Sequence, residues 1–255
     1  MPDMVSLSRG HSGQQFNTPY SENGGTILAV AGTKFCVIAG DTRKSNTYNN
    51  ETRYAPKLFR LTDKAVLAVN GFAADGNMFV NKVRQQLEWY RHGHARDMPL
   101  HEIARLMQTM LYARRFFPYY VYTILGGIEE DGSGAVYTFD SVGSYERDTC
   151  RAAGAAQSFM QPYMDNQVNY KNQRSTHGSF RSTNLPLSSV LSLVMDSFAN
   201  ASERNAEVGD GIEICIVLAK GSSVQGLEKV PGAQEITATG DGERVFIVRR
   251  NLRKD

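Results

Sequence analysis

The stretches that decide the fold of this chain are GGTILAV at Gly24–Val30, FCVIAGDTR at Phe35–Arg43 and PKLF at Pro56–Phe59. They contain short apolar runs, enriched in β-branched residues and separated by turn-forming glycine, asparagine and aspartate, which is the pattern of antiparallel strands. We therefore predict a meander of four strands over Thr26–Ala31, Phe35–Ala39, Lys57–Leu61 and Ala65–Val69.

Working outward from this opening, paired helices alternate with further strands. Apolar residues recur on one helical face in four segments: Phe79–Tyr90, Ile103–Leu111, Phe159–Met164 and Val190–Phe198. Strand character returns at Val121–Leu125, Ala135–Phe139, around Tyr145–Ala152, at Ile212–Ala219 and at Val245–Val248. This order predicts a layered α+β domain in which helices cover the outer faces of stacked antiparallel sheets.

Composition places few other constraints on function. A chain of 255 residues with 41% apolar content forms one substantial core and requires no second domain. Its formal charge of +2 gives no electrostatic case for nucleic acid or an anionic membrane as a partner. The one local excess of basic residues is Arg249–Lys254, which is either a solvated tail or a contact with a subunit or regulator.

The cysteines and the N-terminal segment indicate an intracellular protein. Cys36, Cys150 and Cys215 are odd in number, far apart and in apolar surroundings, as expected of reduced core thiols. No Cys-x-x-Cys or His-x-x-x-His spacing suggests a metal, and we expect no cofactor. The segment up to Glu22 is polar, so we expect neither a signal peptide nor a membrane anchor.

The opening motifs resemble those of the 20S proteasome β subunits. Further strings, LYARRFFPYYVY at Leu111–Tyr122, GAVY at Gly134–Tyr137, VGSY at Val142–Tyr145 and DNQV at Asp165–Val168, make the chain most similar to the non-catalytic β6 (type-1) members. The resemblance implies the four-layer αββα sandwich of N-terminal nucleophile hydrolases. It divides the chain into a propeptide-like extension, 1–24, and a single β-type domain, 25–255, with a polar surface insertion at 170–184.

Active members of this family have a nucleophilic threonine sixteen residues before the aspartate of the Asp-Thr-Arg motif. In this chain that position is Gly25, which has no hydroxyl for covalent acyl transfer. Asp41 and Lys57 match the family's aspartate and lysine, and we interpret them as a retained structural pair, since removing one partner of a buried ion pair costs on the order of 3–5 kcal/mol.

The distal part of the family's site is also altered. Ala155 stands in the turn that supplies a supporting serine, and Asn205 and Val208 replace the aspartate and serine of a later Asp-x-x-Ser-Gly motif. Cleavage after Gly25 would expose Thr26, but a shift of one strand position, about 3.3 Å, turns its side chain to the opposite face. We therefore expect a catalytically inactive subunit of a threonine-type endopeptidase complex.

The resemblance implies a role in assembly within the cytoplasm and nucleus. Its partners would be the neighbouring ring subunits β5 and β7, the opposite β ring and the α ring, in a particle that degrades proteins in an ATP- and ubiquitin-dependent way. The candidate interface residues are aromatic and basic, as is typical of interface anchors: Arg114, Arg115, Phe116, Phe117, Tyr119 and Tyr120. Phe116 and Phe117 would otherwise fill this chain's own core.

Asp140 matches a position that lines part of the substrate channel of subunit β5. The alternative is a turn aspartate that caps the strand exit before Ser141. Two other functions stay open at this point: an active N-terminal threonine hydrolase with unusual processing, and a free-standing binding module on the same scaffold.

Overall fold

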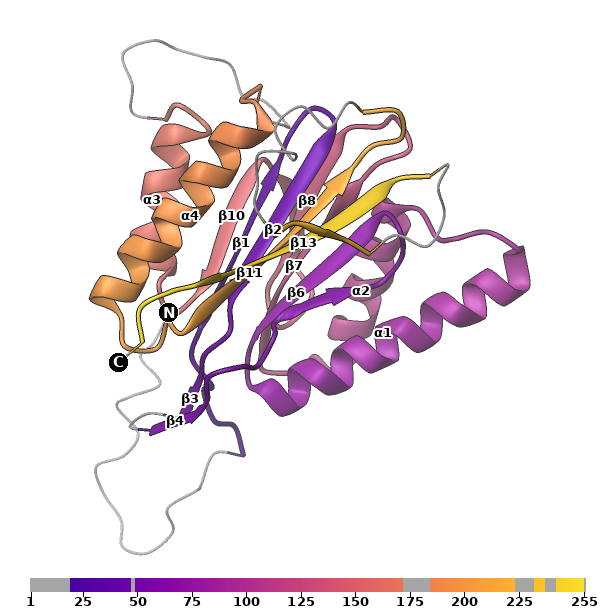
Figure 1. The fold of residues 1–255 in the computed structure, drawn as a ribbon. Helices are drawn as coiled ribbons and strands as arrows, with labels where there is room; N and C mark the ends of the chain where they lie inside the picture. The colour runs from indigo at the N-terminus through magenta and orange to yellow at the C-terminus, as the bar shows by residue number, and fades with distance from the viewer. Residues whose placement is uncertain (1–18, 47–48, 172–183, 223–231, 237–241, 255) are drawn as a thin grey trace, which may run out of the picture.

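The computed structural model describes residues 19–46, 49–171, 184–222, 232–236 and 242–254. Two antiparallel sheets are stacked face to face, and a pair of helices covers each outer face (Figure 1). The α+β class and the four-layer αββα arrangement predicted from the sequence are therefore confirmed.

The first sheet has the strand order β10-β1-β2-β11-β13-β12. The strand bounds are β1 Thr26–Ala31, β2 Phe35–Asp41, β10 Cys150–Gly154, β11 Gly211–Leu218, β12 Gln234–Glu235 and β13 Arg244–Asn251. The second sheet has the order β5-β6-β7-β8-β9. Its strands are β5 Leu58–Arg60, β6 Ala65–Gly71, β7 Val121–Ile128, β8 Gly134–Phe139 and β9 Tyr145–Asp148.

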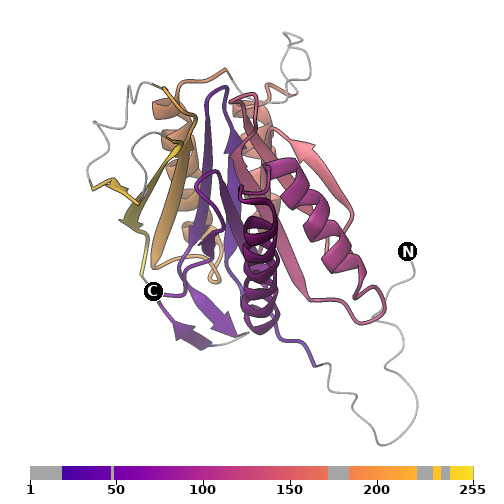
Figure 2. The same ribbon diagram turned by 90° about the vertical axis from the view of Figure 1, so that its right-hand side faces the viewer.

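Helices α3 (Gln157–Gln167) and α4 (Leu187–Arg204) pack on the first sheet, and α1 (Ala73–His94) and α2 (Leu100–Tyr112) pack on the second. Figure 2 shows the two helix pairs on opposite sides of the sheets. Alternation of side chains along β1 explains the layering. Leu28 and Val30 face the α3–α4 layer, whereas Ile27 and Ala29 face the second sheet. Both faces of the strand are thus buried.

Three details differ from the sequence prediction. The four strands predicted as one meander are divided between the sheets, because β1 and β2 pair in the first sheet and β5 and β6 pair in the second. The stretch around Tyr145–Ala152 forms two strands, because β9 pairs with β8 in one sheet and β10 pairs with β1 in the other. The polar edge strand β9 is only partly buried, whereas Cys150 and Ala152 in β10 join the core under α3. A hairpin of β3 (Lys44–Asn46) and β4 (Asn49–Thr52) was not predicted, because its sequence has no apolar alternation.

The predicted propeptide-like segment, 1–24, and the insertion, 170–184, lie largely outside the described residues. The insertion falls between two helices in the chain, because α3 ends at Gln167 and α4 begins at Leu187. Cys36, Cys150 and Cys215 are buried free thiols, and burial raises the pKa of Cys36 to about 12. In the described part of the chain, no helix is long and apolar enough to cross a membrane.

Candidate functional site

Gly25 lies directly before β1 with a positive φ of 78°. Its amide donates to the carbonyl oxygen of Glu207 at 3.1 Å, and its carbonyl accepts from the Ala155 amide at 2.9 Å and from Asn70 Nδ2 at 2.7 Å. A Cβ built on Gly25 would lie 2.3 Å from Lys57 Cε and 2.8 Å from Asp41 Oδ1. A side chain at this position would therefore point directly at the Lys57–Asp41 pair.

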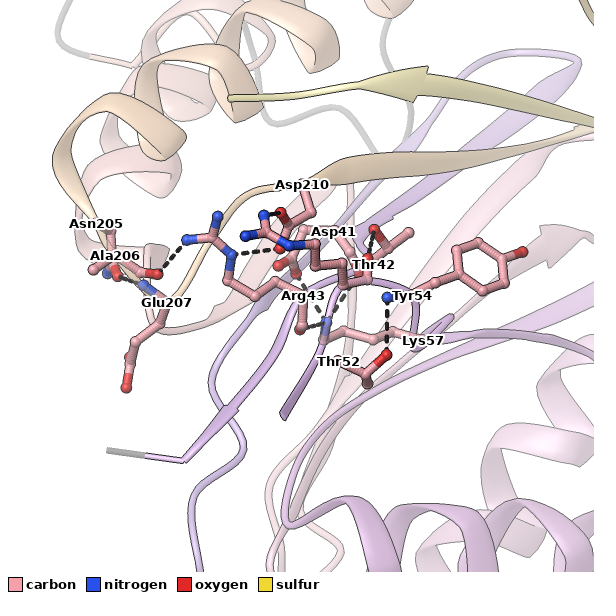
Figure 3. Close-up of polar contacts among 11 residues, drawn as sticks. Asp41, Thr42, Arg43, Thr52, Tyr54, Lys57, Asn205, Ala206, Glu207 and Asp210 are labelled. Atoms are coloured by element: carbon pink, nitrogen blue, oxygen red, sulfur yellow. Dashed lines mark hydrogen bonds and ion pairs between the residues drawn. The ribbon is translucent and has the colours of Figure 1, made fainter. Parts of the chain in front are cut away.

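Lys57 and Asp41 form a buried ion pair, with Nζ 3.1 Å from Oδ1 and side-chain exposures of 10% and 0%. The Lys57 ammonium also donates to the carbonyl oxygens of Asp41, at 2.9 Å, and Arg43, at 2.6 Å. The Thr26 amide donates to Asp41 Oδ1 at 2.7 Å. Burial raises the pKa of Asp41, and the charge of Lys57 opposes this effect. Figure 3 shows Lys57 directed at Asp41 and Arg43.

Arg43 and Asp210 form a second buried ion pair beside the first, and the sequence analysis did not identify it. Arg43 Nε donates to Asp210 Oδ2 at 2.7 Å, and its Nη1 donates to the carbonyl of Ala206 at 2.6 Å (Figure 3). Arg53 donates to the other oxygen of Asp210. The sequence held one signal of this pair. Arg43 comes soon after the buried strand β2, and a buried arginine needs an acidic partner.

The altered distal positions separate into two environments. Asn205 lies close to the Gly25 segment, where its Nδ2 donates to the carbonyl of Ala155 at 3.1 Å and its Oδ1 accepts from the Glu207 amide at 2.8 Å. Val208 is fully buried in the apolar cluster beneath α3 and α4. Alanine, asparagine and valine at these places supply neither a hydroxyl nor a carboxylate to the Gly25 position.

Thr26 is the hydroxyl residue next to Gly25, and its side chain is directed at the start of α3. Thr26 Oγ1 accepts a 2.9 Å hydrogen bond from the amide of Ala156 and the residue is fully buried. A side chain at position 25 would lie on the other face of the chain and would contact Lys57. The Thr26 hydroxyl is therefore held away from the ion pair.

A recess of about 290 Å³ adjoins the Gly25 position. Lys57, Lys44, Phe59, Val69 and Asn77 line it together with the backbone near Gly24. The described residues contain no group of three or more histidine, cysteine or acidic side chains that could hold a metal ion. The polar side chains that line the recess are two ammonium groups and three amides: Lys44, Lys57, Asn23, Asn70 and Asn77.

Asp140 directly follows β8, far along the chain from the Gly25 segment. Its Oδ1 accepts hydrogen bonds from the amides of Val142, at 3.1 Å, and Ser144, at 2.7 Å. The same exposed residue lines a cavity of about 360 Å³ between the ends of the two sheets, together with Thr138, Arg151 and Gln157. Asp140 is therefore a turn-capping residue that also borders an open cavity.

The aromatic segment of residues 114–120 leaves α2 and leads into β7. Phe116 is 98% exposed and Phe117 is 61% exposed, so neither fills the core of this chain. Tyr119 is half buried and contacts Phe79, with ring centroids 5.7 Å apart. The Arg114 guanidinium lies 5.5 Å from the centre of the Tyr119 ring, and Arg115 is exposed.

The N-terminal segment packs against this aromatic segment. Tyr20 donates a 2.8 Å hydrogen bond to the carbonyl of Pro118, and its ring lies 5.7 Å from that of Phe117 and 5.6 Å from that of Tyr120. Three residues later, Asn23 is buried and its Oδ1 accepts from the amide of Ala73 at the start of α1. Residues 20–25 thus connect the aromatic segment to the Lys57–Asp41 pair.

Comparison with known proteins identifies the family. A family model described as "Proteasome subunit" matches residues 21–217. Proteasome subunit beta type-6 of Saccharomyces cerevisiae is 50% identical over 212 residues, covering 81% of this chain and 88% of that protein. The probable proteasome subunit beta type-6 of Schizosaccharomyces pombe is 43% identical, covering 82% and 95%. Proteasome subunit beta type-1 of Danio rerio is 44% identical, covering 80% and 84%. Taken with the four-layer fold, these matches show that the chain belongs to the proteasome subunit family, among the β subunits of the type-6 and type-1 group.

Proposed function

We propose that this chain is a non-catalytic structural subunit of the 20S proteasome β ring. The observation that carries the proposal is the position of Gly25. A side chain there would point at the buried Lys57–Asp41 pair, and glycine places no hydroxyl in that space. Covalent acyl transfer needs an activated nucleophile, so the site retains the supporting pair without the attacking group.

The neighbouring residues do not substitute for the missing group. The Thr26 hydroxyl is bonded to the Ala156 amide on the opposite side of the strand. Ala155, Asn205 and Val208 offer no hydroxyl or carboxylate that could activate an amine or hold a water molecule. Among these residues only Thr26 carries a hydroxyl, and that hydroxyl is directed at the Ala156 amide and not at the Lys57–Asp41 pair.

The Lys57–Asp41 pair then has a structural role. The ammonium of Lys57 joins the end of β2 to the segment after it, through the carbonyls of Asp41 and Arg43. Loss of one charge would leave the other buried without its partner, which is strongly destabilising. This cost explains why both residues are present where the chemistry they would serve is absent.

The work of the chain is to occupy one position in the ring and to shape the chamber. Its proposed partners are the ring neighbours, subunits β5 and β7, the opposite β ring and the α ring. The exposed aromatic rings of Phe116 and Phe117, flanked by Arg114 and Arg115, supply the residue types that dominate interface energetics. We place the subunit in the cytoplasm and nucleus, as part of ATP- and ubiquitin-dependent protein degradation.

Asp140 is the residue through which this chain acts on a neighbour's chemistry. It borders the 360 Å³ cavity and is exposed in this chain, which supports the proposal that it lines part of the substrate channel of subunit β5 in the ring. There it would accept a hydrogen bond from a peptide backbone or disfavour acidic side chains by like-charge repulsion.

Purified particles test the proposal directly. We expect this chain to co-purify with the other 20S subunits, and its intact mass to stay unchanged after treatment with an epoxyketone or β-lactone electrophile that labels catalytic subunits in the same sample. An adduct on this chain would establish an active threonine hydrolase instead. Recovery of the chain only as a 28.3 kDa monomer would favour a free-standing binding module.

A further inference from the structure

The cavity of about 360 Å³ beside Asp140 lies between two open sheet edges. β9 is an end strand of the second sheet and β10 is an end strand of the first, so neither is paired on its outer side with another described strand. The two strands follow one another in the chain, and residues of both line the cavity. An open strand edge presents free backbone amides and carbonyls, which proteins normally cover. This side of the molecule is therefore suited to contact with another chain.

A buried hydroxyl in the wall of this cavity has no hydrogen-bond partner. Thr138 of β8 is only 8% exposed and lines the cavity. Its register partner on β7, Ile124, belongs to the apolar cluster between the sheets, so the Thr138 side chain faces the same space. Among the described residues, none forms a hydrogen bond with the Thr138 hydroxyl. Because an unpartnered buried polar group is unfavourable, this hydroxyl is suited to a group brought by a ligand.

The charged residues that line the cavity are Asp140, Glu146 and Arg151. The Arg151 guanidinium lies 3.4 Å from Glu146 and 3.4 Å from Asp148, so its one positive charge is shared with a carboxylate outside the cavity. Arg147 points to the opposite face of β9, where it donates to Ser133 Oγ at 3.3 Å. The lining therefore has more negative than positive charge.

The Asp140 carboxylate is oriented by this chain but not neutralised by it. Its Oδ1 accepts from the amides of Val142 and Ser144, which fixes the side chain at the turn. Among the described residues, none forms an ion pair with Asp140 or a hydrogen bond with its Oδ2. Oδ2 is thus a preoriented acceptor at the rim of the cavity, and the Thr138 hydroxyl is a second acceptor inside it.

We propose that a lysine or arginine side chain of the adjoining ring subunit docks in this cavity, and that its chain covers the open edges of β9 and β10. Ammonium and guanidinium groups donate the hydrogen bonds that the Thr138 hydroxyl and Asp140 Oδ2 accept, and their charge complements the acidic lining. This inference rests on the proposed function, because subunit β5, the neighbour whose channel Asp140 is proposed to line, supplies the docked side chain.

Thr138→Val separates docking from folding. Because the hydroxyl has no partner within the described chain, we expect its removal to leave the denaturant midpoint of the free chain unchanged or raised. When a tagged variant competes with the untagged chain, mass spectrometry of purified particles gives the fraction incorporated. We expect Thr138→Val to be about threefold under-represented, because the docked cation loses an acceptor.

Thr123→Val is the matched control. The Thr123 hydroxyl is also buried and unpartnered, and the residue adjoins the same cavity. Its register partners Val69 and Phe139, however, belong to the apolar cluster under α1 and α2, so its side chain faces that layer. We therefore expect Thr123→Val to incorporate normally.

Changes of charge at Glu146 test the sign of the occupant's charge. Glu146 is 65% exposed, so its substitution should have little effect on folding. In the same competition, we expect Glu146→Gln to be about threefold and Glu146→Lys about tenfold under-represented, since the first removes an attraction and the second adds a repulsion. Glu88→Lys is the control, because Glu88 is 61% exposed and 3.7 Å from Arg91 but lies on α1, and it should incorporate normally.

The outcomes separate the two proposals. Incorporation of Glu146→Lys at the level of Glu88→Lys, or of Thr138→Val at the level of Thr123→Val, would overturn the docking site. If normal incorporation came with a changed KM of subunit β5 for basic peptides, the cavity would bind substrate and the docking would again be wrong. Absence of the unmodified chain from particles would instead overturn the proposed function.

Discussion

Arg43 Nε donates a 2.7 Å hydrogen bond to the carboxylate of Asp210, and the two side chains are almost completely buried at 1% and 2% exposure. Arg43 follows β2, and Asp210 precedes β11, the strand that pairs with β2. The pair holds the Arg43 backbone, whose carbonyl accepts from Lys57. The Arg43–Asp210 pair thus positions the Lys57–Asp41 pair. Loss of either pair should lower the stability of the chain.

The Asp210 carboxylate should make stability depend on pH in acid. Although burial acts against ionisation, hydrogen bonds from Arg43 and Arg53 lower the pKa of Asp210. A lowered folded-state pKa contributes stability that is present above the unfolded value of about 3.9 and is lost as pH falls through the folded value. We expect Asp210→Asn to lower Tm at pH 7, and the difference from the unmodified chain to shrink below about pH 4.

Asparagine tolerates the positive φ of 65° at this position, so the substitution isolates the charge. Thermal scans between pH 3 and 7 measure the effect. Glu203→Gln, which removes an exposed pair with Arg253, is the matched control and should cost no more than about 1 kcal/mol throughout. If the Tm difference between Asp210→Asn and the unmodified chain were the same at every pH, the lowered pKa of Asp210 would be refuted.

Lys57→Met should destabilise the chain by about 3–5 kcal/mol, because Asp41 would remain buried without its partner. Met keeps most of the Lys57 volume, so cavity formation contributes little. Adding Asp41→Asn should recover part of the loss, because the uncompensated charge is then gone. Denaturant unfolding and incorporation into particles report the effect, and a single variant with unchanged stability would show that the pair is dispensable.

Gly25→Thr should not create a peptidase. The backbone at Gly25 has φ of 78°, and a Cβ there would collide with Lys57, while Ala155, Asn205 and Val208 leave the support incomplete. We expect no labelling by an epoxyketone in assembled particles. The threonine variant should also be less stable than the unmodified chain. Gly25→Ala should show the same loss of stability, which would assign the loss to backbone strain and the added Cβ and not to the hydroxyl. Robust labelling of the threonine variant would mean that Lys57 and Asp41 suffice.

Asp140→Asn and Asp140→Ala should differ in an informative way. Asn keeps an acceptor for the amides of Val142 and Ser144 and removes only the charge, whereas Ala removes both. If Asp140 lines the channel of subunit β5, both variants should change KM for chymotrypsin-like peptides and leave trypsin-like and caspase-like cleavage unchanged. Equal kinetics for all three substrate classes in fully assembled particles would leave Asp140 as a turn residue only.

Phe116→Ala should separate assembly from folding. Because Phe116 is 98% exposed, we expect its removal to change the stability of this chain by no more than about 0.5 kcal/mol while incorporation into particles falls. Native mass spectrometry gives the fraction incorporated. Phe79→Ala, which removes a buried side chain on the core face of α1, is the contrasting variant and should cost about 3–5 kcal/mol in folding. Normal incorporation of Phe116→Ala would remove this residue from the interface.

Local sequence was sufficient for the fold class. The apolar, β-branched run Thr26–Ala31 and the helical faces of Phe79–Tyr90 and Val190–Phe198 indicate which residues of each element are buried, so they predicted a layered α+β domain, and the family resemblance added the four-layer arrangement. The spacing of Gly25, Asp41 and Lys57, together with the resemblance, indicated that these residues belong to one site. The structure brings them into contact.

Contacts between distant segments needed the tertiary structure. Nothing near Arg43 in the sequence indicates that Asp210 and Ala206 will satisfy its guanidinium, because those partners are 167 and 163 residues away. The strand around Tyr145–Ala152 breaks at Thr149 because β9 joins one sheet and β10 joins the other. The exposure of Phe116 depends on the path of the chain from α2 to β7. Sequence by itself determined which residues favour strand, helix or burial, since those preferences are local. Only the folded chain decided which charges meet and which aromatic rings stay exposed, because these depend on the packing of segments that the sequence keeps far apart.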